Sequence, residues 1–135
     1  MPAHIIIENK EGEQIRKIDV TKNGAGLQRV FWDLRYEPTY KPKLRTTPKG
    51  RPWVQLNGEG WRPLVTWDLD LWRGQLGPRV LPGDYIVKLK VGDEEYSQPL
   101  KVLQDPNSQN TMEDMRKLLA IGLELRDAMN MAVKS

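Results

Sequence analysis

Two aspartates, Asp68 and Asp70, have a spacing that could support acid–base chemistry, because they occupy alternate positions of an extended segment. On a strand such side chains lie on one face, about 7 Å apart, within the range of glycosidase carboxylate pairs. We nevertheless interpret them as solvated, because they share the polar face of an otherwise amphipathic segment. The chain has one histidine, His4, and no cysteine, too few for a metal cluster or a His-dependent triad. We therefore predict no catalytic residue, no metal site and no cofactor, and expect no enzyme activity.

Tryptophan is the residue type best suited to binding in this chain. Four of the five tryptophans lie in or beside one long loop, and they are Trp53, Trp61, Trp67 and Trp72. Exposed indoles could stack on sugar rings or hold a protein partner, since Trp is enriched at binding hot spots. Alternatively, they anchor the loop and fill the core, which we favour because such a loop needs a satellite core to hold its shape.

A basic stretch lies in the same loop, at Lys41, Lys43, Arg45, Lys49 and Arg51. The whole chain has 21 basic and 18 acidic residues, a net charge of +3. Nucleic-acid-binding domains usually show a denser basic cluster, and the prolines of this stretch indicate an extended, solvated segment. We predict no nucleic-acid partner.

Short segments with strand character recur along the chain, separated by turn signals. They cover residues 4–8, 14–20, 27–35, 65–72, 85–91 and 95–103. Because no helices alternate with them, the pattern predicts an antiparallel β-sandwich of the immunoglobulin or fibronectin type III class. Ile15 and Ile18 break strict alternation, which predicts a bulge or twist. Pro99 indicates that the last segment is an edge strand or is bulged.

The long loop covers residues 37–66 and interrupts the sandwich. It contains five prolines and three glycines, and connections of this length are usually functional or mobile. We assign residues 1–106 to the sandwich domain, with this loop as an insertion, and residues 107–135 to a helical segment.

The helical segment begins after Asp105 and Pro106. Asn110 or Thr111 can cap it, and acidic residues follow in its first turn. An apolar stripe at helical spacing contains Met112, Met115, Leu118, Leu119, Leu125 and Met129. We expect this stripe to pack on the sandwich or on a second copy in a homodimer. The absence of a closing signal predicts that the helix is part of a longer helical segment.

Several stretches of sequence resemble a known family. They are FWDLRY at 31–36, LW at 71–72, GPRVLPGDYIVKL at 77–89, QPLKV at 98–102, Asp105-Pro106 and LELRDA at 123–128. Together they are similar to the domain that follows the β-propeller in bacterial sortilin-like (VPS10-like, BNR-repeat) proteins, which are often labelled glycosyl hydrolases. The Pro-Gly-x-Tyr part also occurs in the Ig-like domain of flagellar hook-capping proteins. The resemblance covers about residues 28–36 and 69–130.

The resemblance implies a non-catalytic accessory domain that docks on the upstream β-propeller of an extracellular or periplasmic parent protein. The chain itself contains no Asp-box of the S/T-x-D-x-G-x-x-W type, so no hydrolase label can be placed on it. The loop is also longer and more basic than the family pattern. Trp32 and Tyr85 are expected to meet in the core. A carbohydrate-binding module that uses the four tryptophans is the second hypothesis. No membrane partner is expected, because no apolar run approaches the ~20 residues of a membrane helix.

Overall fold

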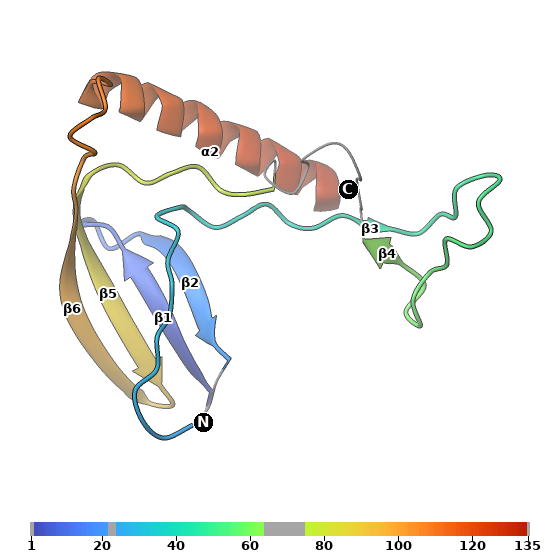
Figure 1. Cartoon of the computed structure of the whole chain (residues 1–135), viewed down its shortest axis with the longest axis horizontal. Coiled ribbons are helices and arrows are strands. Elements are labelled where there is room, and N and C mark those ends of the chain that lie inside the picture. Colours follow the sequence, from blue (N-terminus) through green and yellow to red (C-terminus); the bar gives the residue numbers. More distant parts are fainter. Residues whose placement is uncertain (1, 22–23, 64–74, 135) are drawn as a thin grey trace.

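The computed structural model describes residues 2–21, 24–63 and 75–134. Four antiparallel strands form one sheet in the order β2-β1-β5-β6 (Figure 1). They are β1 (Ala3–Glu8), β2 (Gln14–Val20), β5 (Gly83–Val91) and β6 (Glu94–Val102). A two-stranded pair, β3 (Lys43–Leu44) and β4 (Arg62–Pro63), and the helix α2 (Met112–Lys134) complete the elements. The chain is therefore mainly β and antiparallel with one C-terminal helix, as the sequence predicts.

The β1–β2 hairpin closes through a turn organised by Asn9. Its side-chain oxygen accepts hydrogen bonds from the amides of Glu11, at 3.1 Å, and Glu13, at 2.8 Å. Gly12 follows at φ 80°, which glycine adopts without strain. In the ladder Ile7 pairs with Arg16 and Glu8 with Gln14, so the residue between these two partners is extra. This confirms the predicted bulge and places it at residue 15.

The β5–β6 hairpin pairs in continuous register, from Gly83 opposite Val102 to Val91 opposite Glu94. Pro99 faces Ile86 in the ladder without any register shift. A proline lacks the amide hydrogen of a ladder donor and therefore suits an edge position. β6 is the outer strand of the sheet, which confirms the predicted edge strand.

The core lies on one face of the sheet. The side chains of Ile7, Ile15, Val80 and Tyr85 are buried together, and Trp32 packs against them. The Trp32 ring meets the Tyr85 ring edge-on, with 6.0 Å between centroids and an interplanar angle of 70°. The predicted contact between these two rings is confirmed.

The predicted strand at 27–35 is wrong. This segment crosses the core face of the sheet (Figure 1) without forming a regular ladder, and its single bridge joins Arg35 to Arg79. In the sequence Val30, Trp32 and Leu34 alternate as the more apolar face of this segment. The alternation holds as far as Trp32, which is half-buried, while Phe31 is exposed. At Leu34 the backbone turns to φ 60°, and the Leu34 side chain reaches solvent although the alternation placed it on the apolar face.

Residues 34–39 and 75–80 lie side by side through irregular hydrogen bonds. The amide of Tyr36 donates to the Pro78 carbonyl at 2.9 Å, and the amide of Val80 donates to the Leu34 carbonyl at 2.8 Å. Gly77 is buried here, and a Cβ on it would lie 2.3 Å from the Tyr36 carbonyl oxygen. Within the described ranges, residues 34–39 and 75–80 cover the core, and no second large sheet lies over it. The predicted strand at 65–72 falls outside the described residues.

The helix α2 begins at a cap that the sequence predicts. The Thr111 hydroxyl accepts a hydrogen bond from the Asp114 amide at 3.1 Å, which satisfies one free donor of the first turn. Along its length α2 lies against the chain near Pro78, and a Cβ on Gly122 would lie 2.8 Å from the Pro78 Cβ. A small residue is therefore needed where the helix approaches this segment most closely.

Candidate functional site

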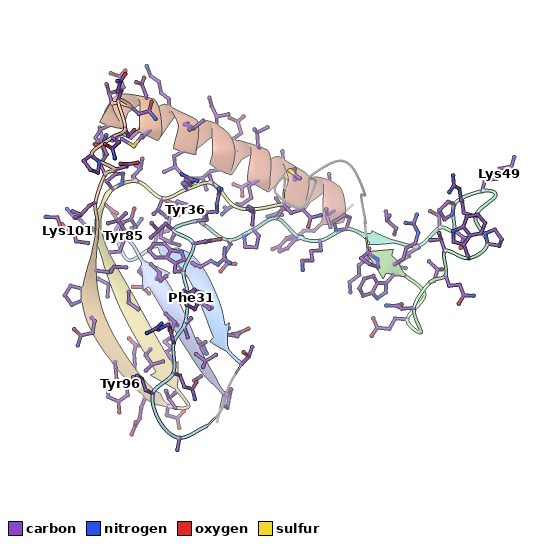
Figure 2. The ribbon with its side chains drawn as sticks, in the orientation of Figure 1. Phe31, Tyr36, Lys49, Tyr85, Tyr96 and Lys101 are labelled. Carbon is purple, nitrogen blue, oxygen red and sulfur yellow. The ribbon has the colours of Figure 1, made fainter. Side chains whose placement is uncertain are left out.

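Residues 41–63, called the arm below, extend away from both the sheet and the helix (Figures 1 and 2). The β3–β4 pair forms the base of the arm, where Lys43 pairs with Pro63 and Leu44 with Arg62. Arg62 also donates from Nε to the Thr46 carbonyl at 2.8 Å. Since each strand has two residues, turns and side chains fix the rest of the arm.

Three turns shape the arm. The first is closed by the Arg51 amide, which donates to the Pro48 carbonyl at 3.1 Å, with Gly50 at φ 76°. The second follows directly and is closed by the Val54 amide, which donates to the Arg51 carbonyl at 3.0 Å. In the third, the side-chain oxygen of Asn57 accepts from the amides of Glu59 at 3.0 Å and Trp61 at 3.1 Å. Side-chain acceptors of this kind replace the ladder bonds that the arm lacks.

The two tryptophans of the arm each carry a cation over the ring. The Lys43 ammonium lies 5.0 Å from the Trp61 ring centroid, and the Arg51 guanidinium lies 5.6 Å from that of Trp53. Both distances allow cation–π attraction. Trp61 is half-buried and donates from its indole nitrogen to the Glu59 carboxylate at 2.7 Å. Trp53 is 66% exposed.

The structure therefore separates the four predicted tryptophans. Neither Trp53 nor Trp61 contributes to the core cluster on the sheet, so in the described chain they do not fill the core. Trp61 instead packs within the base of the arm, and Trp53 is presented to solvent. Trp67 and Trp72, like Asp68 and Asp70, lie outside the described residues.

Positive charge is concentrated in the arm. It holds six basic residues and one acidic residue, a net charge of +5, and the remaining fifteen basic and seventeen acidic residues give −2. The weak basic bias of the chain thus comes entirely from this segment. The basic residues are Lys41, Lys43, Arg45, Lys49, Arg51 and Arg62.

The apolar stripe of α2 is divided between two environments. Met112, Met115 and Leu119 are half-buried on the side that faces the body, as one of the two predicted arrangements requires. The other predicted interface residues are exposed, and they are Leu118, Leu125 and Met129. With Ile121 these three form a second, exposed apolar set, called the outer helix face below, and Leu118 lies at its border with the body, where it lines a cavity with Pro78 and Leu103.

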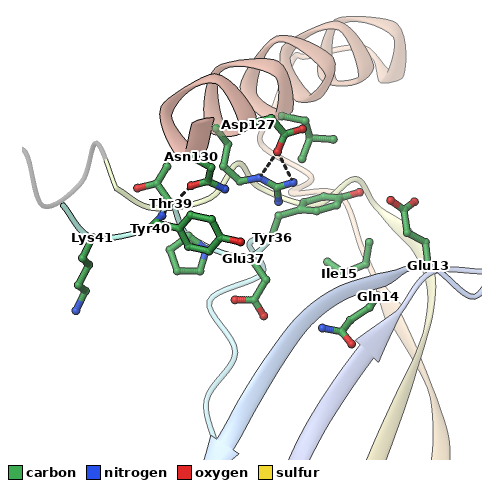
Figure 3. Close-up of a pocket in the computed structure, with 13 residues that line it drawn as sticks. Glu13, Gln14, Ile15, Tyr36, Glu37, Thr39, Tyr40, Lys41, Asp127 and Asn130 are labelled. Carbon is green, nitrogen blue, oxygen red and sulfur yellow. Dashed lines mark hydrogen bonds and ion pairs between the residues drawn. The ribbon is translucent and has the colours of Figure 1, made fainter. Parts of the chain in front are cut away.

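A polar cavity of about 700 Å³ lies between α2, the start of β2 and residues 36–41 (Figure 3). Tyr36 and Glu13 line it from the body, and Arg126 and Asn130 line it from the helix. Asn130 accepts a hydrogen bond from the Tyr40 amide at 2.8 Å. This bond ties the far end of the helix to the beginning of the arm.

The electrostatics of the cavity favour hydrogen bonding over proton transfer. Burial, followed by the nearby Glu13 carboxylate, raises the pKa of Tyr36, and the Arg126 guanidinium opposes this effect. The Tyr36 phenol is therefore protonated near neutral pH and can donate a hydrogen bond to a group that enters the cavity. Arg126 is ion-paired with Asp127 at 2.9 Å, which neutralises the cation that the helix presents.

The cavity and its residues were not predicted from the sequence. Tyr36 and Arg126 both lie in stretches that carry the resemblance, FWDLRY and LELRDA, but 90 residues of chain separate them. Only the packing of α2 brings them together. These two stretches were the available signals, whereas nothing local marks Asn130.

Among the described residues, no group of three or more metal-ligating side chains occurs. His4 is half-buried on β1. In the same part of the chain, no helix has the length and apolar character needed to cross a membrane.

Comparisons of the chain with protein-family models, with curated proteins and with solved structures found no match.

Proposed function

We propose that this chain is a non-catalytic interaction domain that is completed by a partner surface, within a larger secreted β-propeller protein of the sortilin-like, BNR-repeat type. The observation that carries the proposal is the apolar surface that the sheet and α2 leave exposed among the described residues, including Phe31 at 81% and Leu118 at 71% exposed.

Part of this apolar surface lies on the sheet. Tyr85 and Leu89 lie on the core face of β5, and Leu100 and Tyr96 face them from β6. Tyr85 is buried, but Leu89, Tyr96 and Leu100 are exposed. Phe31, on the segment that crosses this face, is 81% exposed (Figure 2). The side of the sheet toward β6 is therefore an apolar surface without a cover among the described residues.

A separate set of exposed apolar side chains is the outer helix face, where Leu118 is 71% exposed and Leu125 60%. Contiguous apolar patches on a soluble domain usually mark interfaces. The upstream β-propeller is the partner that we propose for them, with an extracellular or periplasmic location for the parent protein. A homodimer through α2 is the competing arrangement.

The immunoglobulin or fibronectin type III assignment is part of the same proposal. It is supported by the Tyr85 hydroxyl, which donates back to the Leu81 carbonyl at the start of β5. This bond is similar to the tyrosine corner of such sandwiches, where a tyrosine near a strand start bonds to the backbone a few residues upstream. Trp32 against Tyr85 supplies the matching aromatic contact.

Co-purification with the separately expressed upstream β-propeller tests the proposal. We expect a stable complex in which the amides of α2 exchange hydrogen more slowly. The double variant Ile121→Lys, Leu125→Lys should weaken it, while the control Arg116→Ala, at an exposed charged position of the same helix, should not. Failure to associate under any condition would count against the proposal. Association of the chain with itself, seen by sedimentation at several concentrations, would favour the homodimer.

A second candidate function is supported by one observation. Trp53, 66% exposed at a distance from the body, has the exposure required for stacking on a sugar ring. A carbohydrate-binding module would therefore use the arm, with Trp53 and Trp61. Affinity electrophoresis on a panel of polysaccharides should show retardation, which Trp53→Ala or Trp61→Ala should abolish.

A further inference from the structure

We propose that the arm binds acidic polysaccharides, with its indoles stacked on sugar rings and its cations paired with the carboxylates of those sugars. The inference rests on the second candidate function and adds the charge class of the glycan. It concerns residues 41–63 alone and is independent of the proposed contact with a β-propeller.

The cations of the arm are available to a ligand. In the part of the chain that the structure describes, none of the six basic side chains forms an ion pair with a carboxylate. The single acidic residue of the arm, Glu59, accepts a hydrogen bond from the Trp61 indole. A net charge of +5 on a projecting segment attracts anions, and the remainder of the chain, at −2, does not share this attraction.

Ring and cation occur as pairs in the arm. Arg51 and Trp53 form one pair and Lys43 and Trp61 the other, with 5.6 and 5.0 Å between cation and ring centroid. A uronic acid residue has the complementary composition, because its pyranose ring has an apolar face and carries a carboxylate on a ring carbon. Charge-assisted bonds from a guanidinium or ammonium to a carboxylate are about twice as strong as neutral ones. A neutral sugar could use the indoles but not the cations.

Polar side chains between the pairs suit sugar hydroxyl groups. Thr47 and Gln55 are exposed on the arm, and hydroxyl and amide groups can both donate and accept hydrogen bonds. The arm is thus lined with the three types of group that an acidic sugar chain requires.

A nucleic acid is the less suitable polyanion. Duplex DNA carries one charge about every 1.7 Å, and the net-negative remainder of this chain would be repelled by such a density. Nucleic-acid-binding domains are usually basic over a continuous face, whereas here the basic residues are confined to one projecting segment. These observations favour a polyanion of lower charge density.

The test compares polygalacturonate with dextran, a neutral polysaccharide, by calorimetric titration of the whole chain. We expect polygalacturonate to bind, with an affinity that falls as salt is raised from about 50 to 200 mM. We expect dextran not to bind. The double variant Arg51→Ala, Trp53→Ala should weaken binding at least about tenfold. Removal of one aromatic side chain that stacks on a nucleic-acid base has an effect of this size. The control Lys101→Ala removes one exposed cation from the sheet edge and should leave affinity within about twofold.

Each other result overturns the inference in a distinct way. Equal binding of dextran would leave the glycan-binding function standing and remove its acidic specificity. Tighter binding of a 20-residue oligothymidylate than of polygalacturonate at the same salt would assign the arm to nucleic acid. Loss of affinity with Arg51→Ala but none with Trp53→Ala would reduce the arm to unspecific charge. Absence of all binding would overturn both the inference and the second candidate function.

Discussion

The β1–β2 hairpin and the arm contain the same five-residue turn, in sequences that share only asparagine, glutamate and glycine. In both turns the asparagine side chain accepts from the amides two and four residues later, at Asn9 and again at Asn57. In both, the fourth residue is a glycine near φ 80°, Gly12 at 80° and Gly60 at 78°. The local chemistry of the two regions is therefore equivalent.

The surroundings of the two turns differ. The hairpin turn leads into Ile15, which is 1% exposed and packs on Ile7 in the core. The arm turn leads into Trp61, which is half-buried and held by Lys43 and Glu59. Identical turns thus serve a region stabilised by burial and a region stabilised by local bonds alone. Local chemistry is sufficient to shape a loop, but burial determines whether the loop belongs to the cooperative fold.

The largest loss of stability should come from the β1–β2 hairpin, whose turn leads into the buried core. Ile15→Ala should lower the free energy of unfolding by about 3 kcal/mol, because it leaves a cavity between well-packed side chains. Urea unfolding followed by circular dichroism measures this loss. The control Leu27→Ala alters a side chain that is fully exposed and should change stability by less than about 0.5 kcal/mol. Similar losses in both variants would contradict the small core described above.

A smaller loss is expected where two backbones meet. Gly77→Ala places a Cβ against the Tyr36 carbonyl and should lower stability by about 1 to 3 kcal/mol. In the arm, Gly58 has nothing within 4 Å of the corresponding position, so Gly58→Ala should leave the melting temperature unchanged. If both substitutions were equally harmless, residues 34–39 and 75–80 would not lie in contact.

The same contrast explains which features were predictable from sequence. Both sheet hairpins, the bulge, the edge strand with Pro99 and the Thr111 cap follow from alternation and turn residues close in sequence. At 27–35 the alternation correctly placed Trp32 inward, but alternation records only which side faces the core. It does not record whether a ladder partner exists, and it could not anticipate the turn to φ 60° at Leu34.

Contacts between distant parts of the chain were beyond the sequence pattern. The cavity of Tyr36 and Arg126 depends on how α2 packs, and the pairing of Lys43 with Trp61 depends on closure of the arm. The charge of the arm was visible in the sequence, but its projection from the body was not.

A moderate, pH-dependent loss of stability is expected from the core residue Tyr85. Burial, with a smaller contribution from Tyr36, raises the pKa of Tyr85 to about 12. Its neutral phenol therefore contributes stability that is complete below pH 10, the ordinary value, and is lost as the pH rises toward 12. Tyr85→Phe should cost about 1 kcal/mol at neutral pH through the lost bond to Leu81, and should remove this part of the alkaline decline. Unfolding free energies of both proteins between pH 8 and about 12 measure the difference, and parallel curves would contradict it.

The smallest global effect, and the most direct test of the comparison, comes from the two asparagines. Asn9→Ala and Asn57→Ala each remove one acceptor from two amides, so the local loss is the same. Asn9→Ala should lower global stability by about 1 kcal/mol, because its turn belongs to the cooperative unit. Asn57→Ala should leave the melting temperature unchanged and instead accelerate hydrogen exchange at the amides of Glu59 and Trp61, since exchange there needs only local opening. If Asn57→Ala lowered the melting temperature as much as Asn9→Ala, the arm would be part of the cooperative fold. The arm would then not be a separate projecting segment that is free to bind a ligand.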